Sequence, residues 1–75
     1  MAEFTVDARF LAPPEPMERA LEGLDRLENA DDVMLLLLHR EPFPLYDVLR
    51  RNGFEYQTSS TEDGTFQIRV RKVAA

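Results

Sequence analysis

Few residues in this chain could carry chemistry. His39 is the only histidine and cysteine is absent, which excludes a disulfide, a thiolate nucleophile, a persulfide and a thiolate metal site. His39 could bind a ligand, handle a proton or join a metal site with Asp7 or Glu41, but nothing in the spacing forces these groups together. A structural histidine satisfied by its neighbours is the favoured alternative. We therefore expect no metal and no cofactor.

The other polar residues that could belong to a functional site also have simple structural interpretations. Asp7 and Arg9 stand two residues apart and could form an acid–base device, although a surface pair that braces a loop is favoured. Tyr46 follows the start of a predicted helix, and we expect its ring to be half-packed with a backbone or solvent partner for the hydroxyl. With no nucleophile, the chain is predicted not to be an enzyme, apart from a weak acid–base role for His39.

Length and composition indicate one small domain over residues 1–75. Apolar residues make up 44% and charged residues 31%, as in ordinary globular proteins. Nine basic against fourteen acidic residues give a net charge of −5, which repels phosphate backbones and disfavours nucleic-acid binding. The first residues do not resemble a secretory signal, and the longest apolar run is too short to span a bilayer. A cytoplasmic location without membrane contact is the default expectation.

Apolar spacing predicts the first two elements. Phe4, Val6 and Ala8 alternate with polar residues, which favours a half-buried strand. The helical spacing that follows gives an inner face of Met17, Ala20, Leu21, Leu24 and Leu27. On the outer face, Glu15 with Arg19 and Glu22 with Arg26 have the four-residue spacing of helix ion pairs.

The rest of the chain predicts one more strand, one helix and a hairpin. Val33–Leu38 is an unbroken apolar run typical of a central strand that is buried on both faces. Pro44 suits the first turn of a helix that ends at Asn52 and Gly53, with an inner face of Leu45, Val48 and Leu49. Two alternating runs begin at Phe54 and Phe66, and turn residues from Ser60 to Gly64 join them.

The predicted order is βαβαββ, an α+β fold. A right-handed crossover makes the first two strands parallel and gives a two-layer sandwich, with a mixed four-stranded sheet and both helices on one face. The open face would carry an apolar stripe from the central strand, formed by Val33, Leu35 and Leu37 or by Met34, Leu36 and Leu38. Arginine stems could cover this stripe, or another protein could, including a second copy of the chain.

The stretch from Val6 to Pro16 resembles the signature of the TusA/SirA-like sulfur-carrier superfamily, in which a strand ends in L-D-x-R/K-G-L-x-C-P-x-P. Asp7, Arg9, Leu11 and two prolines fall in register, but Phe10 replaces the glycine and Pro13 replaces the reactive cysteine. The stretch from His39 to Tyr46 also resembles a cysteine-free branch of small bacterial domains of unknown function. The resemblance implies the same fold without persulfide transfer.

The ends of the two parallel strands define the candidate site, because ligands commonly bind there in open α/β sheets. The expected members are Asp7, Arg9, Pro13, Pro14, Glu15, Pro16, His39, Arg40 and Tyr46. A helix start can bind anions through free N–H groups, but three prolines remove such donors and Glu15 already supplies negative charge. A rigid helix start is therefore the favoured interpretation of this proline-rich turn.

The leading hypothesis is a non-catalytic binding or regulatory module related to the sulfur carriers, with an unidentified protein partner. A small-molecule binder, with its site at the edge formed by Asp7, Arg9, His39 and Tyr46, is the alternative. RNA binding is less favoured: the topology resembles the C-terminal domain of bacterial translation initiation factor three, but the negative charge opposes it.

Overall fold

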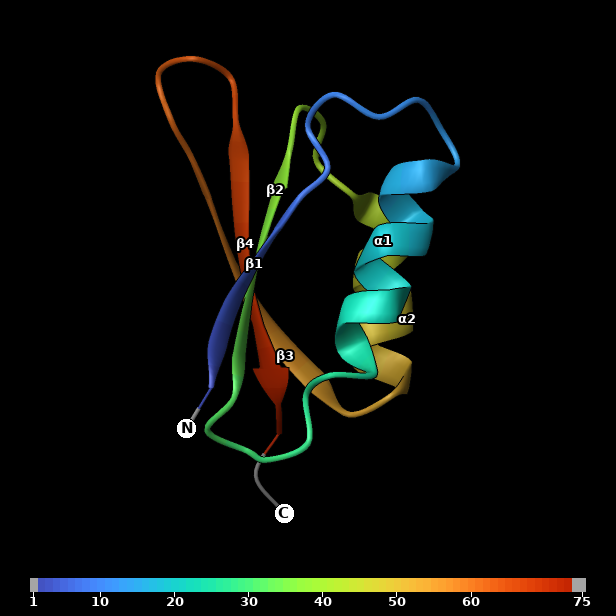
Figure 1. Ribbon diagram of the computed structural model, residues 1–75, viewed down its shortest axis with the longest axis vertical. Helices are drawn as coiled ribbons and strands as arrows, with labels where there is room; N and C mark the ends of the chain where they lie inside the picture. Colours follow the sequence, from blue (N-terminus) through green and yellow to red (C-terminus); the bar gives the residue numbers. More distant parts are fainter. Residues whose placement is uncertain (1, 74–75) are drawn as a thin grey trace.

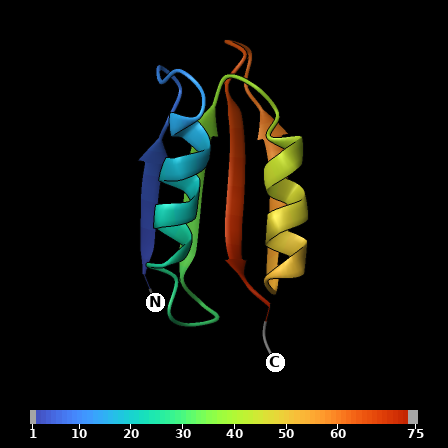
Figure 2. The ribbon, with the colours of Figure 1, turned by 90° about the vertical axis from the view of Figure 1, so that its right-hand side faces the viewer.

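The computed structural model describes residues 2–73 as a four-stranded sheet with two helices on one face (Figures 1 and 2). The elements are β1 (Glu3–Asp7), α1 (Glu15–Leu24), β2 (Val33–Leu38), α2 (Phe43–Arg51), β3 (Phe54–Ser60) and β4 (Phe66–Lys72). The predicted βαβαββ order and two-layer α+β architecture are confirmed. The second helix begins at Phe43, so Pro44 lies in its first turn, as predicted.

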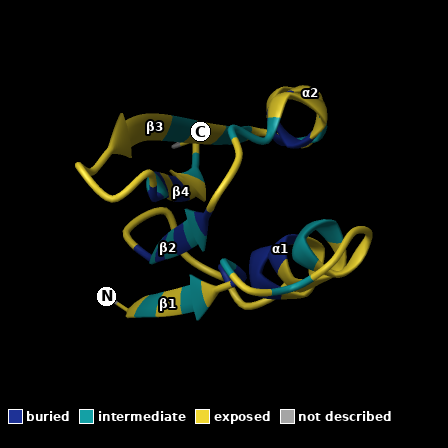
Figure 3. Ribbon diagram, turned by 90° about the horizontal axis from the view of Figure 1, so that it is seen from above, coloured by how far each residue is buried: buried dark blue, intermediate teal, exposed yellow. Residues whose placement is uncertain are grey.

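The sheet is mixed, with strand order β1-β2-β4-β3. β1 and β2 are parallel, so that Asp7 lies opposite Leu37, while β4 runs antiparallel to both of its neighbours. α1 packs on β1 and β2, and α2 packs on β3, which leaves the other face of the sheet open (Figure 3). The connections from β1 to α1 and from β2 to α2 leave the sheet at the same end, at the top of Figure 1.

Alternation along β2 decides which of its side chains enter the core. Met34, Leu36 and Leu38 are buried beneath the helices, whereas the intervening residues of β2 are only half-buried on the open face. β2 is therefore fully buried on one face rather than on both. The other apolar residues that are at most 1% exposed come from the helices, the connection after α1, and β4: Ala20, Leu27, Leu45, Leu49, Ile68 and Val70.

The inner face of α1 differs from the predicted face at one turn. Leu21 was expected to point into the core, but its side chain is 41% exposed, and Gly23 takes the buried position instead. The helix approaches β2 so closely that a methyl group at Gly23 would overlap the sulfur of Met34. The helix ends at Leu24, and Leu27 is buried from the connection that follows it.

The charged side chains of α1 do not form the predicted pairs four residues apart. Arg19 lies 3.8 Å from Glu22, three residues away. The Arg26 guanidinium lies 3.9 Å from the centre of the Phe4 ring, on β1. A cation above an aromatic face is attracted by the ring, so Arg26 connects the end of the helix to the edge of the sheet.

Asp32 joins three segments at the other end of the sheet, a role that the sequence did not indicate. Its carboxylate is 4% exposed and accepts hydrogen bonds from the backbone N–H groups of Ala2, Glu28 and Asn29, each at 3.0 Å. These donors, led by that of Asn29, lower the pKa of Asp32. The carboxylate thus ties the start of β1 to the connection between α1 and β2.

Replacing Asp32 with asparagine is expected to lower the melting temperature by several degrees at neutral pH. The amide carries no charge, and its NH2 group would stand where a carboxylate oxygen accepts a backbone N–H. A carboxyl with a lowered pKa in the folded state stabilises the fold above its unfolded pKa of about 3.9, and this stabilisation disappears as pH falls through the folded pKa. The difference between wild type and Asp32→Asn should therefore shrink below about pH 4. Melting curves from pH 7 to pH 2, with exposed Asp25→Asn as control, check this; a pH-independent difference would contradict it.

Candidate ligand-binding site

The parallel pairing of β1 and β2 brings the predicted site residues together. Beyond the last paired residues of these strands, the Ala8 N–H donates to the Leu37 carbonyl at 2.9 Å. The chain therefore continues side by side for one more residue, which places Arg9 and His39 at the same end of the sheet. The prediction that the carboxyl ends of these two strands lie together is confirmed.

Asp7 and Arg9 form a bidentate pair at this end. The Arg9 side chain donates from Nε to Oδ1 at 2.9 Å and from a terminal nitrogen to Oδ2 at 2.8 Å, and the Arg9 backbone N–H also reaches Oδ1. Hydrogen bonds from Arg9, above all those of its side chain, lower the pKa of Asp7 to about 2. Both groups are thus ionised at neutral pH, and the pair braces the turn after β1 as expected.

Behind this pair lies a pocket lined by every proline of the chain. Its wall contains Pro13, Pro14 and Pro16 from the start of α1, and Pro42 and Pro44 from the start of α2. The Pro13–Pro14 peptide bond is cis. Proline has no backbone N–H, so this wall is apolar and offers few backbone donors although two helices begin beside it. We call this feature the proline pocket.

The floor of the proline pocket is also apolar. It is formed by Ala8, Leu11, Met17, Leu38 and Leu45, and the pocket has a volume of about 460 Å³. Such a volume lies within the range of roughly 300–1,000 Å³ that is typical of small-molecule sites. The sequence pattern predicted most of these residues to lie in the core. It did not indicate that this end of the core is open to a pocket.

The ionisable residues of the proline pocket are Arg9, His39, Arg40 and Glu41. Phe10 meets the His39 ring edge to face, with the centroids 5.2 Å apart, and the Phe10 side chain is 81% exposed. Arg40 is exposed and, among residues 2–73, makes no hydrogen bond or ion pair. The exposed Phe10 ring therefore lies close to the proline pocket, and the Arg40 guanidinium at the pocket has no hydrogen-bond or ion-pair partner within residues 2–73.

Six of the nine predicted site residues line the proline pocket: Arg9, Pro13, Pro14, Pro16, His39 and Arg40. Asp7 is next to the pocket through its pair with Arg9. Glu15 is exposed at the first position of α1 and is not part of the pocket wall. Tyr46 also lies outside the pocket wall, although its hydroxyl is hydrogen-bonded to Glu41, which lines it. The structure thus brings the two proline-rich turns together, and a ligand-binding role for any of these residues stays a prediction.

Tyr46 has a structural position instead. Its side chain is 6% exposed rather than half-packed, and its ring stacks on that of Tyr56 with the centroids 4.3 Å apart. The hydroxyl donates to Glu41 Oε2 at 3.0 Å and lies 2.6 Å from Thr58 Oγ1, so its partners are side chains rather than backbone or solvent. Burial, supported by Glu41, raises the pKa of Tyr46. The contacts of Tyr46 with Tyr56 and Thr58 therefore connect α2 to β3.

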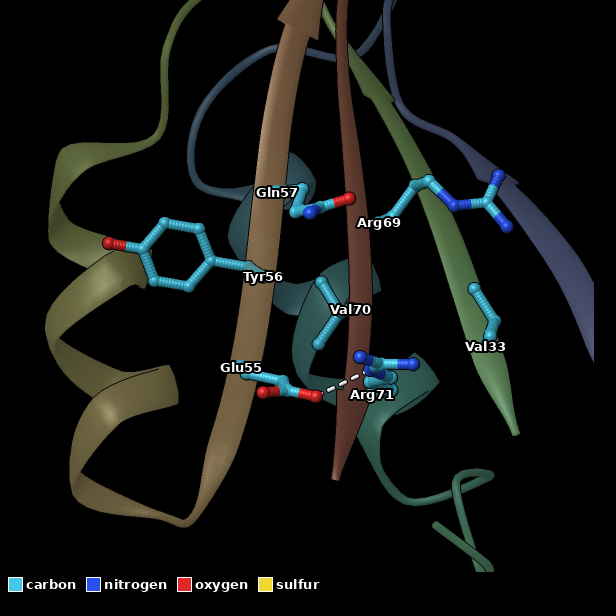
Figure 4. Close-up of a pocket in the computed structure, with 7 residues that line it drawn as sticks. All are labelled: Val33, Glu55, Tyr56, Gln57, Arg69, Val70 and Arg71. Carbon is cyan, nitrogen blue, oxygen red and sulfur yellow. Dashed lines mark hydrogen bonds and ion pairs between the residues drawn. The ribbon is translucent and has the colours of Figure 1, made fainter. Parts of the chain in front are cut away.

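The open face of the sheet offers a smaller and more polar hollow. Figure 4 shows the hollow, of about 270 Å³, with charged side chains of β3 and β4 around it. Arg71 pairs with Glu55 across these strands, and Arg69 lies 3.7 Å from Glu3 on β1. These two ion pairs lie on the same face of the sheet as the half-buried stripe of β2, where arginine stems were one of the expected covers. Homo-oligomerisation through this face stays a prediction.

Residues 2–73 contain neither a candidate metal cluster nor a candidate membrane span. No group of three or more histidine, cysteine, aspartate and glutamate side chains in that range is arranged to hold a metal ion. No helix in the same range is long and apolar enough to cross a membrane.

The strand order, the two helices on one face and the pocket at the end of the parallel pair define a class of two-layer α+β domains. The chain belongs to the family described as "Uncharacterized conserved protein (DUF2249)", whose model matches residues 5–72. No curated protein sequence matches the chain.

A solved structure has the same fold. The SirA-like protein from Desulfitobacterium hafniense superposes with a TM-score of 0.78 at 21% sequence identity, and the match covers 93% of this chain and 97% of that one. The predicted TusA/SirA-like fold is therefore confirmed, and the chain has no cysteine at all. At this identity the likeness concerns the fold alone.

Proposed function

We propose that this protein is a non-catalytic binding module and that its ligand is a small molecule held in the proline pocket. The observation that carries the proposal is the pocket itself, in which five prolines and five other apolar residues surround about 460 Å³ at the end of the parallel strands. A concave, mostly apolar site with a few polar groups at its margin is what small ligands require. The site is also rigid, because proline restricts the backbone.

Two observations favour a small molecule over the protein partner that the sequence suggested first. Ion pairs of Arg69 with Glu3 and of Arg71 with Glu55 lie on the open sheet face, and the hollow there is smaller and more polar than the proline pocket. The proline pocket is concave and restricted to one end of the molecule, which suits a compact ligand. A protein partner and a cytoplasmic location stay predictions, as does the absence of catalysis.

A titration with N-phenyl-naphthylamine, an uncharged aromatic probe, tests the proposal. We expect saturable shifts of backbone amide signals around the proline pocket, at Ala8, Leu11, Met17, His39 and Leu45, because the probe would bury its rings against these residues. Amide-resolved NMR of the labelled protein gives the shifts and the affinity together. Shifts confined to the open face, or no saturable shift at all, would contradict the proposal.

A further inference from the structure

The charged groups of the proline pocket differ in whether their charge is already offset. Asp7 neutralises Arg9 through its bidentate pair, whereas no carboxylate among residues 2–73 is hydrogen-bonded to Arg40. A cationic side chain at the margin of a concave apolar site favours an anionic ligand. The pocket therefore combines apolar surface with one guanidinium that an anion could approach.

The polar groups of the proline pocket are not equally available to a ligand. Arg9 is held on both sides of its guanidinium by Asp7, and Glu41 accepts the hydrogen bond of Tyr46. Arg40 is different, because it is exposed and has no hydrogen-bond or ion-pair partner within residues 2–73. The Arg40 guanidinium is thus the donor group that a ligand could use without first breaking an internal bond.

Side chains must supply the recognition of an anion here. A helix start ordinarily offers backbone N–H groups to an anion, but prolines occupy five positions around both helix starts and the first turns already have internal bonds, such as Tyr46 N–H to the Pro42 carbonyl. An arginine matches the two oxygens of a carboxylate or a similar oxyanion. His39, the next residue along the chain, adds a ring that meets the Phe10 ring edge to face.

We propose that the ligand of the proline pocket is an amphipathic organic acid, with an apolar body against the proline and leucine side chains and its oxyanion at Arg40 and His39. The inference rests on the proposed function and adds the chemical class of the ligand. The exposed Phe10 ring beside His39 extends the apolar surface, so a ligand with an aromatic or aliphatic body longer than the pocket gains further contact.

Two probes with the same rings separate the charge from the apolar body. Anilinonaphthalene sulfonate has the rings of N-phenyl-naphthylamine plus one anionic group. We expect the wild-type protein to bind the sulfonate about three- to fivefold more tightly, the gain expected from one solvent-exposed charge pair. Arg40→Gln should remove this gain and leave the affinity for the neutral probe within about twofold. Arg51→Gln, an exposed arginine at the end of α2, is the matched control.

Each outcome decides the inference. Equal affinity for both probes, or an affinity for the sulfonate that Arg40→Gln leaves unchanged, overturns the organic-acid assignment while the pocket itself still binds the neutral probe. Equal losses for both probes in Arg40→Gln also overturn it, because the arginine would then act on the apolar body or on the fold. If the neutral probe fails to shift the amides of the proline pocket, the proposed function is overturned as well.

Discussion

Replacing Leu11 with tryptophan is expected to weaken the binding of N-phenyl-naphthylamine at least about tenfold, which corresponds to about 1.4 kcal/mol. Leu11 is half-buried in the connection between β1 and α1 and forms part of the floor of the proline pocket. The larger indole would take the volume that the probe needs. Because the residue lies in a connection outside the helices and strands, the change should leave the fold intact.

The matched control is the same substitution on the exposed side of α1, Leu21→Trp. Leu21 is 41% exposed and is not part of the pocket wall, so the affinity for the probe should stay near that of wild type. NMR titrations give both dissociation constants. If Leu11→Trp binds the probe as tightly as Leu21→Trp does, the probe does not occupy the proline pocket.

A methyl group at position 23 is expected to destabilise the protein by about 1–2 kcal/mol, or roughly 5–15 °C in melting temperature. In Gly23→Ala the new methyl would overlap the sulfur of Met34, and the Val6 side chain lies 3.3 Å from the same point. Overpacking of this kind costs about 1–3 kcal/mol, and the better helix propensity of alanine returns up to about 1 kcal/mol. The loss should therefore exceed the gain.

Glu22→Ala, at the neighbouring exposed position of α1, is the control and should change the free energy of unfolding by less than about 0.5 kcal/mol. Chemical denaturation of the wild type and the two variants gives the three free energies. An increase in stability for Gly23→Ala would contradict this close approach of α1 to β2, or would mean that Met34 moves aside at no cost.

Periodicity predicted the order of the elements because each has a clear signal in the chain. Val33–Leu38 is continuous and apolar, and two alternating runs around a turn-rich stretch gave the hairpin of β3 and β4. The site could be placed because parallel strands end at one edge, and both proline-rich turns follow such ends. Six of the nine residues expected there do line the proline pocket.

The predicted and observed positions of some side chains differ because they depend on the distances between helices and sheet. A periodic pattern in the sequence does not contain these distances. Helical spacing alone makes Leu21 an inward residue, but α1 lies so close to Met34 that Gly23 faces the strand and Leu21 is rotated outward. Tyr46 likewise looked like a residue of the site, although Thr58 and the Tyr56 ring hold it against β3. Both positions depend on contacts with residues distant in sequence.

The apolar floor of the proline pocket could not be separated from the core by sequence. Leu38 and Leu45 are buried residues of regular elements, and their spacing is the same whether their outer ends contact protein or an open pocket. The available signal was the position of the prolines, all of which fall in the two connections that follow the parallel strands or in the first turns of the helices after them. Turns that cannot supply N–H groups leave an apolar wall.

Contacts between bound N-phenyl-naphthylamine and protein methyl groups test the central claim most directly. An isotope-filtered NOE spectrum of the complex should show the protons of the probe close to the methyl groups of Leu11, Met17, Leu38 and Leu45, which line the proline pocket. NOEs to Val33 or Leu35 on the open face of the sheet, with none to the residues of the pocket, would contradict the claim that this pocket is the binding site.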